Sequence, residues 1–162
     1  LFLQEGKEKT HPHCELLLVA AARAQHVEEV LRPALKNFDL ILCDRYTHSS
    51  LAYQGGGRKI SSSDINTINR FATQELQPML SILLDLSVET SLSRMQARSE
   101  NGENHLDRFE NEQIEFYERV RDQYLKLAEK EKDLFFVIDA NQKEDIIFDI
   151  MKEKILTLLS TQ

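Results

Sequence analysis

Three short apolar runs decide the fold: FDLILC at residues 38–43, LSILLDL at residues 80–86 and LFFVI at residues 134–138. Each run contains or directly precedes an aspartate, namely Asp44, Asp85 and Asp139. Strands buried on both faces are nearly continuous apolar segments, whereas half-exposed antiparallel strands alternate between apolar and polar residues. The three runs therefore predict three buried strands, each ending at an aspartate.

Helical patterns separate these runs. Apolar residues recur at spacings of three and four, which predicts amphipathic helices. Pro33 predicts a kink or restart in the first helix, and Ser87 is the expected N-cap of the third. The predicted helices cover residues 15–36, 64–76, a stretch that begins at Val88 and includes Met95, 111–129 and 143–159.

The alternation of strands and helices determines the expected architecture. It indicates βαβ units, so the predicted fold class is α/β, with a parallel sheet covered by helices. With 162 residues and no linker or repeat, the chain is expected to form one domain. Ligands of such sheets bind beyond the carboxyl ends of the strands. The residues that follow each strand are therefore the first candidates for a site.

Composition narrows the classes of partner. Hydrophobic residues make up 41% and charged residues 29%, as in globular proteins. No apolar run approaches the ~20 residues of a membrane-spanning helix, and the first residues do not resemble a signal peptide. Cys14 and Cys43 match no zinc or redox spacing, so a cytoplasmic location is expected. The net charge of −7 argues against a nucleic-acid polymer, but converging arginines would still allow a small anionic substrate.

The densest polar segment is DRYTHSSLAYQGGGR, residues 44–58, directly after the first predicted strand. Arg45 suits a phosphate because its planar fork donates two parallel hydrogen bonds, and the adjacent Asp44 could orient that fork or hold a magnesium-bound water. An Asp–Arg pair alone is equally consistent with a polar surface turn. The glycines match no dinucleotide fingerprint and precede no lysine-serine or lysine-threonine pair. We therefore expect them to form a flexible crossing loop.

This segment belongs to a series of short strings that follow one another along the chain. They are ELLLVAAARAQHV (15–27), RPAL (32–35), DRY (44–46), LAYQG (51–55), LLDL (83–86), DRFE (107–110) and VIDA (137–140). In this order and spacing, from about residue 16 to the end of the chain, they resemble the bacterial thymidylate kinases. The resemblance implies a fold like that of the P-loop nucleoside monophosphate kinases. It also implies conversion of dTMP to dTDP in dTTP biosynthesis, with ATP as co-substrate, Mg²⁺ as cofactor and a homodimeric assembly.

The resemblance also implies roles for individual residues. Several residues would bind dTMP. Arg45 would bind its 5′-phosphate, and Asp44 would lie near the magnesium ion. Arg23 would donate to a thymine carbonyl, and Tyr53 would lie against C2′ of the sugar, where a ribose hydroxyl would clash. Ser50 and Gln54 would contact the edge of the base. The loop that borders the adenine of ATP would be Asp139, Ala140, Asn141 and Gln142.

A second arginine pair lies further along the chain. Arg94 and Arg98 are four residues apart, so they share one face of a helix. Composition alone favours a solvated helix face followed by a surface loop. The resemblance instead implies a lid at about residues 94–108, which closes over ATP and brings these arginines to the transferring phosphoryl group as catalytic residues.

Two features depart from the family pattern. The position of Val19 usually holds a phenylalanine on which thymine stacks, and stacking contributes roughly 1–3 kcal/mol. In addition, no GxxxxGK[ST] motif stands among the 162 residues. That loop cradles the β- and γ-phosphates, so we expect the chain to be a fragment of the fold without its first strands and P-loop, and to have little kinase activity alone.

Two other functions remain open from the sequence. A truncated, inactive homologue that binds only nucleotide or a partner subunit would also lack the phosphate loop. A related kinase with a different nucleotide acceptor is the second alternative, although Arg23, Tyr53 and Gln54 together match the thymidylate pattern.

Overall fold

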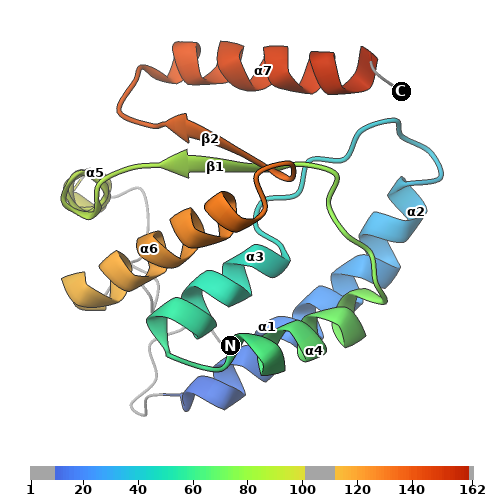
Figure 1. Ribbon diagram of the computed structural model, residues 1–162, viewed down its shortest axis with the longest axis horizontal. Coiled ribbons are helices and arrows are strands. Elements are labelled where there is room, and N and C mark those ends of the chain that lie inside the picture. Colours follow the sequence, from blue (N-terminus) through green and yellow to red (C-terminus); the bar gives the residue numbers. More distant parts are fainter. Residues whose placement is uncertain (1–9, 101–111, 161–162) are drawn as a thin grey trace.

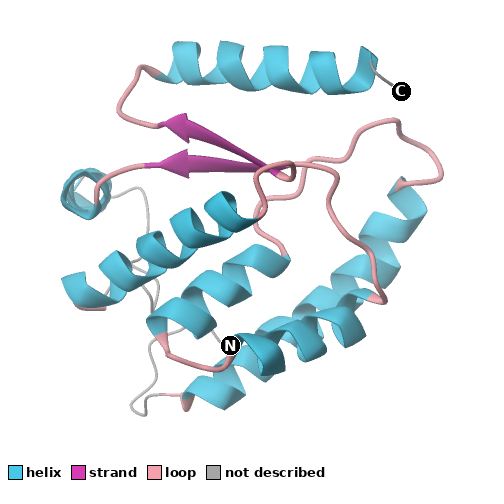
Figure 2. Ribbon diagram, in the orientation of Figure 1, coloured by secondary structure: helices cyan, strands magenta, loops and turns pink. Residues whose placement is uncertain are grey.

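The structure is a computed structural model that describes residues 10–100 and 112–160, with only the backbone at 98–100. Helices predominate, arranged around a small sheet (Figures 1 and 2). Two stretches of helix have the wider π-helical winding. In chain order the elements are α1 (Pro12–His26), a π-helical turn (Val27–Leu31), α2 (Arg32–Ala34), α3 (Thr47–Ser50), a π-helical segment (Leu51–Gly57), α4 (Ser62–Thr73), β1 (Ser81–Asp85), α5 (Val88–Glu100), α6 (Ile114–Lys130), β2 (Phe135–Asp139) and α7 (Glu144–Ser160).

The two strands form a parallel pair. Ser81 lies opposite Phe135, and Asp85 lies opposite Asp139. The Ala140 N–H then donates to the Asp85 carbonyl at 2.8 Å, which extends the pairing by one residue. Helix α7 lies on one side of the sheet, and α6, α3, α1 and α4 lie on the other (Figure 1). The predicted α/β architecture, with helices covering a parallel sheet, is confirmed.

The predicted strand at residues 38–43 is wrong. This segment pairs with no other described segment, and Phe38 and Leu42 are 66% and 73% exposed. An apolar run supplies suitable side chains, but a strand also needs a neighbouring backbone for its N–H and C=O groups. The two observed strands are also less buried than predicted, since Leu84 and Val137 are 48% and 44% exposed.

The first predicted helix is present, and Pro33 affects it as expected. Proline has no N–H to donate, and its ring clashes with the carbonyl of the residue four positions earlier, here Glu29. The chain widens into the π-helical turn Val27–Leu31 just before Pro33, and the Arg32 N–H donates to the Val27 carbonyl. The wider winding lets the helical path continue to Ala34 without the bond that proline removes.

The start of α1 differs from the prediction by one turn. The helix was predicted from residue 15, but it begins at Pro12, with His11 as the N-cap. Nδ1 of His11 accepts a hydrogen bond from the His13 N–H at 3.3 Å. Proline is favoured at the first helical position, where its missing N–H would have had no partner in any case.

The other four predicted helices are confirmed as α4 to α7. Ser87 caps α5 as predicted, because its Oγ accepts a hydrogen bond from the Thr90 N–H at 3.2 Å. Helix α4 ends three residues before the predicted position, where Gln74 and Glu75 take left-handed backbone angles of φ 48° and 63°. A left-handed residue at this position terminates a helix.

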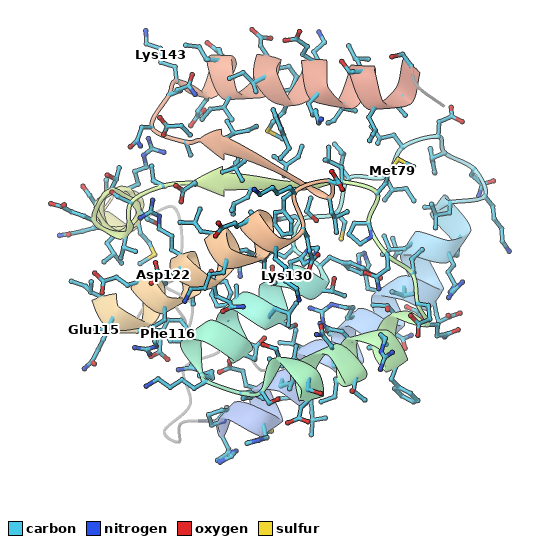
Figure 3. The ribbon with its side chains drawn as sticks, in the orientation of Figure 1. Met79, Glu115, Phe116, Asp122, Lys130 and Lys143 are labelled. Carbon is cyan, nitrogen blue, oxygen red and sulfur yellow. The ribbon has the colours of Figure 1, made fainter. Side chains whose placement is uncertain are left out.

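The glycines do not form the expected flexible loop. They belong to the π-helical segment Leu51–Gly57, which packs along α6. A Cβ on Gly56 would lie 2.7 Å from the Arg119 carbonyl oxygen, and a Cβ on Gly57 would overlap the Phe116 ring. Figure 3 shows Phe116 on the side of α6 toward this segment. The glycines are therefore required for close approach between two helices.

The core lies among the helices on the α6 side of the sheet. One cluster joins α1, the π-helical segment, α4 and α6 through Leu16, Leu51, Ile65 and Leu127. A second cluster is built on Phe116 and includes the tyrosines of α6. No helix within residues 10–100 and 112–160 is long and apolar enough to cross a membrane.

Candidate functional site

Arg45 lies at the end of the 38–43 segment, beside Tyr53. Its backbone is left-handed, at φ 65°, which is uncommon for a residue with a Cβ. Its Nη2 donates to the Tyr53 hydroxyl at 3.1 Å, and its guanidinium carbon lies 4.9 Å from the centre of the Tyr53 ring. Arg45 and the adjacent Asp44 are both exposed. The structure thus brings together the guanidinium, carboxylate and phenol that the sequence singled out.

Arg23 is held firmly in place from α1. It is only 9% exposed, and its Nη1 donates to Asn69 Oδ1 at 2.7 Å. Its Nη2 donates to the Tyr46 carbonyl at 3.0 Å. Burial lowers the pKa of Arg23 from its usual value, and the Tyr46 and Cys43 side chains oppose this shift. These contacts use two of the five N–H groups of the guanidinium and fix its plane.

Asn69 was missed by the sequence analysis. It is 4% exposed, and its Nδ2 donates to the Thr47 carbonyl at 3.2 Å while its Oδ1 holds Arg23. It therefore ties α1 to the start of α3. A signal was available, because Asn69 lies on the apolar face of α4 between Ile65 and Ala72. A polar residue at such a position needs a buried partner.

The Gln54 side chain is buried and is not open to solvent. It is 3% exposed, and its Nε2 donates to Glu15 Oε1 at 2.8 Å. Glu15 is itself 0% exposed and pairs with Arg58, whose Nη2 lies 3.0 Å from Glu15 Oε2 and 2.7 Å from Glu112 Oε1. The sequence analysis missed this network, although Glu15 interrupts the apolar face of the first helix.

Two other predicted contacts line the same region. Val19 is half-buried on α1, one turn from Glu15 and one turn from Arg23. Ser50 is fully buried, and its hydroxyl has no hydrogen-bond partner among the described residues. An unpartnered buried hydroxyl is costly, so a polar group of a ligand that reached it would be stabilised.

Helix α6 contributes Tyr124 to this region. The Tyr124 hydroxyl donates to Ser49 Oγ at 2.8 Å. Burial raises the pKa of Tyr124, and the nearby Tyr53 and Asp44 raise it further, whereas Ser49 and Arg45 oppose the shift. The phenol therefore stays protonated at neutral pH and braces the helical segment that carries Tyr53.

The carboxyl ends of β1 and β2 form the second predicted region. Asp139 accepts hydrogen bonds from the backbone N–H and Nδ2 of Asn141, at 2.9 and 2.8 Å. The backbone bond is the main reason that the pKa of Asp139 is lowered. Gln142 Nε2 donates to the Asp139 carbonyl at 3.1 Å, so the loop is a tight turn. Ala140 is buried, at 7% exposure.

Arg121 of α6 lies at this same edge. It grips Asp85 through two parallel hydrogen bonds, Nε to Oδ1 at 2.7 Å and Nη2 to Oδ2 at 2.9 Å. The bond to Asp85 raises the pKa of Arg121. No sequence pattern indicates this pair, because its members are far apart in the chain. Arg121 also lines a groove of about 910 Å³ between α5 and α6, whose other walls include Ser87, Leu92, Gln96 and Ile114.

The predicted lid is described only in part. Residues 94–100 belong to α5, where Arg94 is exposed. The side chain of Arg98 and residues 101–108 lie outside the described residues. The structure therefore places Arg94 on a solvated helix face and leaves its predicted contact with a phosphoryl group as a prediction.

The described residues contain no cluster of three or more metal-ligating side chains. Asp44 is exposed beside Arg45 and offers one carboxylate. Magnesium is commonly held by only one or two carboxylates together with substrate phosphates and water. Asp44 thus fits a magnesium ion that arrives with a nucleotide.

Comparisons with known proteins show which family the chain resembles. A family profile described as thymidylate kinase matches residues 2–150. The thymidylate kinase of Geotalea daltonii is 46% identical over 148 residues, which cover 90% of this chain and 69% of that protein. The thymidylate kinases of Pelobacter propionicus and Enterococcus faecalis are each 40% identical, and each alignment covers 96% of this chain and 72% of the relative.

The match extends over most of the chain and includes α1, which carries Arg23, the bend that carries Arg45 and the π-helical segment that carries Tyr53. The parallel strands covered by helices are consistent with the P-loop nucleoside monophosphate kinase fold of these relatives. This chain therefore belongs to the thymidylate kinase family, whose members are nucleoside monophosphate kinases.

Proposed function

We propose that this protein transfers the γ-phosphoryl group of ATP to the 5′-phosphate of dTMP, with Mg²⁺ as cofactor. The observation that carries the proposal is the position of Arg45, exposed beside Asp44 and 3.1 Å from the Tyr53 hydroxyl. A guanidinium there matches the double negative charge of a nucleoside monophosphate. Tyr53 contacts that guanidinium, so it would lie beside the sugar that is bonded to the phosphate.

The base would lie along α1, next to Val19. Arg23 would donate to a thymine carbonyl with the N–H groups that Asn69 and Tyr46 leave unused. Ser50 and Gln54 would complete the contacts to the edge of the base. Because Arg23 and Gln54 are buried and fixed by other contacts, they lose little freedom when the base binds.

The transfer itself needs no general base, because the acceptor is a phosphate oxygen that is already ionised at neutral pH. The protein would align donor and acceptor and neutralise the charge that develops between them. Arg45 would hold the acceptor, and Arg94 and Arg98 would approach the donor. Asp44 would help to place Mg²⁺, which neutralises charge on the β- and γ-phosphates. The turn at residues 139–142 would border the adenine.

Calorimetry with dTMP tests the acceptor half of this proposal. We expect a dissociation constant below ~1 mM for dTMP, because the KM values of enzymes for their substrates usually lie below about 1 mM. Thymidine should bind more weakly because it lacks the phosphate, and the ribose analogue of dTMP should bind more weakly because of Tyr53. Failure to bind dTMP, or equal affinity for dTMP and thymidine, would contradict the assignment.

A coupled ADP-release assay tests the transfer half. The 162 residues contain no GxxxxGK[ST] motif, so we expect low turnover from the chain alone. The same residues joined to a strand and such a loop should reach roughly 1–100 s⁻¹ with dTMP. Reactions without dTMP provide the background. A joined protein that binds dTMP but never transfers would favour the binding-module alternative.

The half-buried Val19 allows a test of the base position. Val19→Phe should tighten dTMP binding by about 1 kcal/mol, because an aromatic ring at this position would stack on thymine. Overpacking would oppose this gain, at a cost of ~1–3 kcal/mol. Affinity by calorimetry and stability by urea unfolding separate the two effects. Unchanged or weaker binding in a well-folded variant would show that residue 19 does not face the base.

We also propose that two copies of the chain associate through α1 and α4. Phe71 on α4 is 88% exposed, and Leu17 on α1 is 58% exposed. Phe71 lines a groove of about 870 Å³ together with Ala21 and Ala24. Leu17 lies one turn before Ala21 on the same stripe of α1. Small residues allow two helices to approach closely, and the exposed apolar side chains would be buried by a second copy.

Sedimentation velocity tests this assembly. Phe71→Asp should convert a dimer into a monomer at micromolar concentration, because it places a charge in the proposed interface. Phe148→Asp is the matched control, since Phe148 is also exposed, at 63%, but lies on α7 across the sheet. A monomeric parent protein, or the same effect from both variants, would contradict the interface.

A further inference from the structure

Glu15 is a buried charge that the proposed function leaves without a role. Its side chain is 0% exposed. It lies on α1 one turn before Val19 and two turns before Arg23, so the three side chains follow one stripe of the helix. The proposed thymine site is built on the other two residues of this stripe. Glu15 therefore lies at one end of the region where the base would bind.

The partners of Glu15 determine how the Gln54 amide is oriented. Glu15 pairs with Arg58, Nη2 to Oε2 at 3.0 Å, and accepts hydrogen bonds from Arg58 Nε and Gln54 Nε2. An ionised carboxylate has no hydrogen to donate. Rotating the amide by half a turn would place its oxygen against the carboxylate oxygens, which repel it. The Gln54 nitrogen must therefore face Glu15, and its oxygen, Oε1, must point away.

We propose that Glu15 is a positioning residue that fixes the Gln54 amide and so selects bases that carry a ring N–H. The inference rests on the proposed function, in which Gln54 contacts the edge of the base. In this orientation Gln54 offers the base an acceptor, while Arg23 offers donors. Arg58 supports the arrangement because it keeps a positive charge beside Glu15, at 14% side-chain exposure.

This pattern of donors and acceptors matches thymine and opposes cytosine. Thymine carries a carbonyl oxygen, O4, next to an N3–H, so it accepts from Arg23 and donates to Gln54. Cytosine carries an amino group next to an unprotonated N3, so its donor meets the Arg23 donors and its acceptor meets the Gln54 oxygen. Buried polar groups left unpaired make such discrimination strong.

The test compares the affinities of dTMP, dCMP and dUMP by calorimetry in the parent chain and in Glu15→Gln. A glutamine at position 15 can donate or accept, so the Gln54 amide is free to turn. We expect the preference for dTMP over dCMP to fall by about tenfold or more, as for one lost hydrogen bond. The ratio of dTMP to dUMP should stay constant, because uracil and thymine share the same O4 and N3–H.

Three further variants distinguish a positioning role of Glu15 from a general loss of structure at the site. Glu112→Gln breaks the other ion pair of Arg58, at 2.7 Å, without touching Gln54, and should leave the dTMP to dCMP ratio unchanged. Gln54→Leu should lower the ratio as much as Glu15→Gln. The double variant should lower it no further, because both residues act through one amide.

A measurement on the unaltered protein keeps the inference testable if Glu15→Gln does not fold. In nitrogen-15 NMR spectra, the Gln54 side-chain amide hydrogens should exchange slowly both with and without dTMP, and bound dTMP should show a protected N3 imino proton. An unchanged dTMP to dCMP ratio in folded Glu15→Gln, additive losses in the double variant, or rapid exchange of the Gln54 amide would overturn the role of Glu15. If dTMP does not bind the parent chain at all, the proposed function fails instead.

Discussion

Arg45→Ala should weaken dTMP binding by roughly 10- to 150-fold, since a hydrogen bond to a charged group contributes about 1.5–3 kcal/mol. The exposed guanidinium of Arg45 would donate two parallel hydrogen bonds to the phosphate. The ring and hydroxyl of Tyr53 hold this guanidinium in place. Calorimetric titration with dTMP measures the effect directly. Arg45→Lys should recover only part of the loss, because an ammonium group cannot donate two parallel bonds.

Thymidine provides the control ligand for this prediction. It lacks the phosphate, so its affinity should be nearly the same in the parent chain and in Arg45→Ala. Arg32→Ala is the control variant, because Arg32 is an exposed arginine that pairs with Glu28. An equal loss of dTMP and thymidine binding in Arg45→Ala would mean that the variant damages the site as a whole. Unchanged dTMP binding would mean that the phosphate is held elsewhere.

Arg58→Met should destabilise the fold by about 3–5 kcal/mol, the usual cost of removing one partner from a buried ion pair. The change removes the positive charge of Arg58 from beside Glu15, which is 0% exposed. Methionine keeps much of the apolar contact that Arg58 makes with Phe116, where the guanidinium lies 4.6 Å from the ring centre. Urea unfolding at neutral pH measures the loss.

Arg32→Met is the matched comparison for stability. The Arg32–Glu28 pair has a similar distance, 3.1 Å, but its side chains are 38% and 51% exposed. Water screens such a pair, so its loss should cost only ~0–1 kcal/mol. If both variants lower stability equally, the buried network does not carry the stability assigned to it. A small loss in Arg58→Met alone would show that Glu15 finds another partner.

The sequence by itself determined the elements whose cause is local. The spacing of apolar residues predicted five of the six helical regions among the described residues, and Pro33 predicted the irregular winding that the structure has at Val27–Leu31. The sixth, at residues 47–57, was not predicted. The predicted features depend on contacts within one or two turns, so neighbouring residues specify them. The same holds for part of the site. Arg45 and Tyr53 lie eight residues apart, and one short helical segment brings their side chains together.

Features that depend on contacts between residues far apart in the chain were determined only by the tertiary structure. Residues 38–43 have the composition of a strand, yet they pair with no other described segment. The glycines at 55–57 were expected in a flexible loop, but the closeness of α6 explains Gly56 and Gly57.

The same limit applies to the buried polar network. Glu15 meets Gln54 and Arg58, which lie 39 and 43 residues away. Periodicity shows that a charge interrupts an apolar face, but it does not show which distant side chain will compensate that charge. Burial makes such a pairing obligatory, and the packing of α1 against residues 47–58 selects the partner.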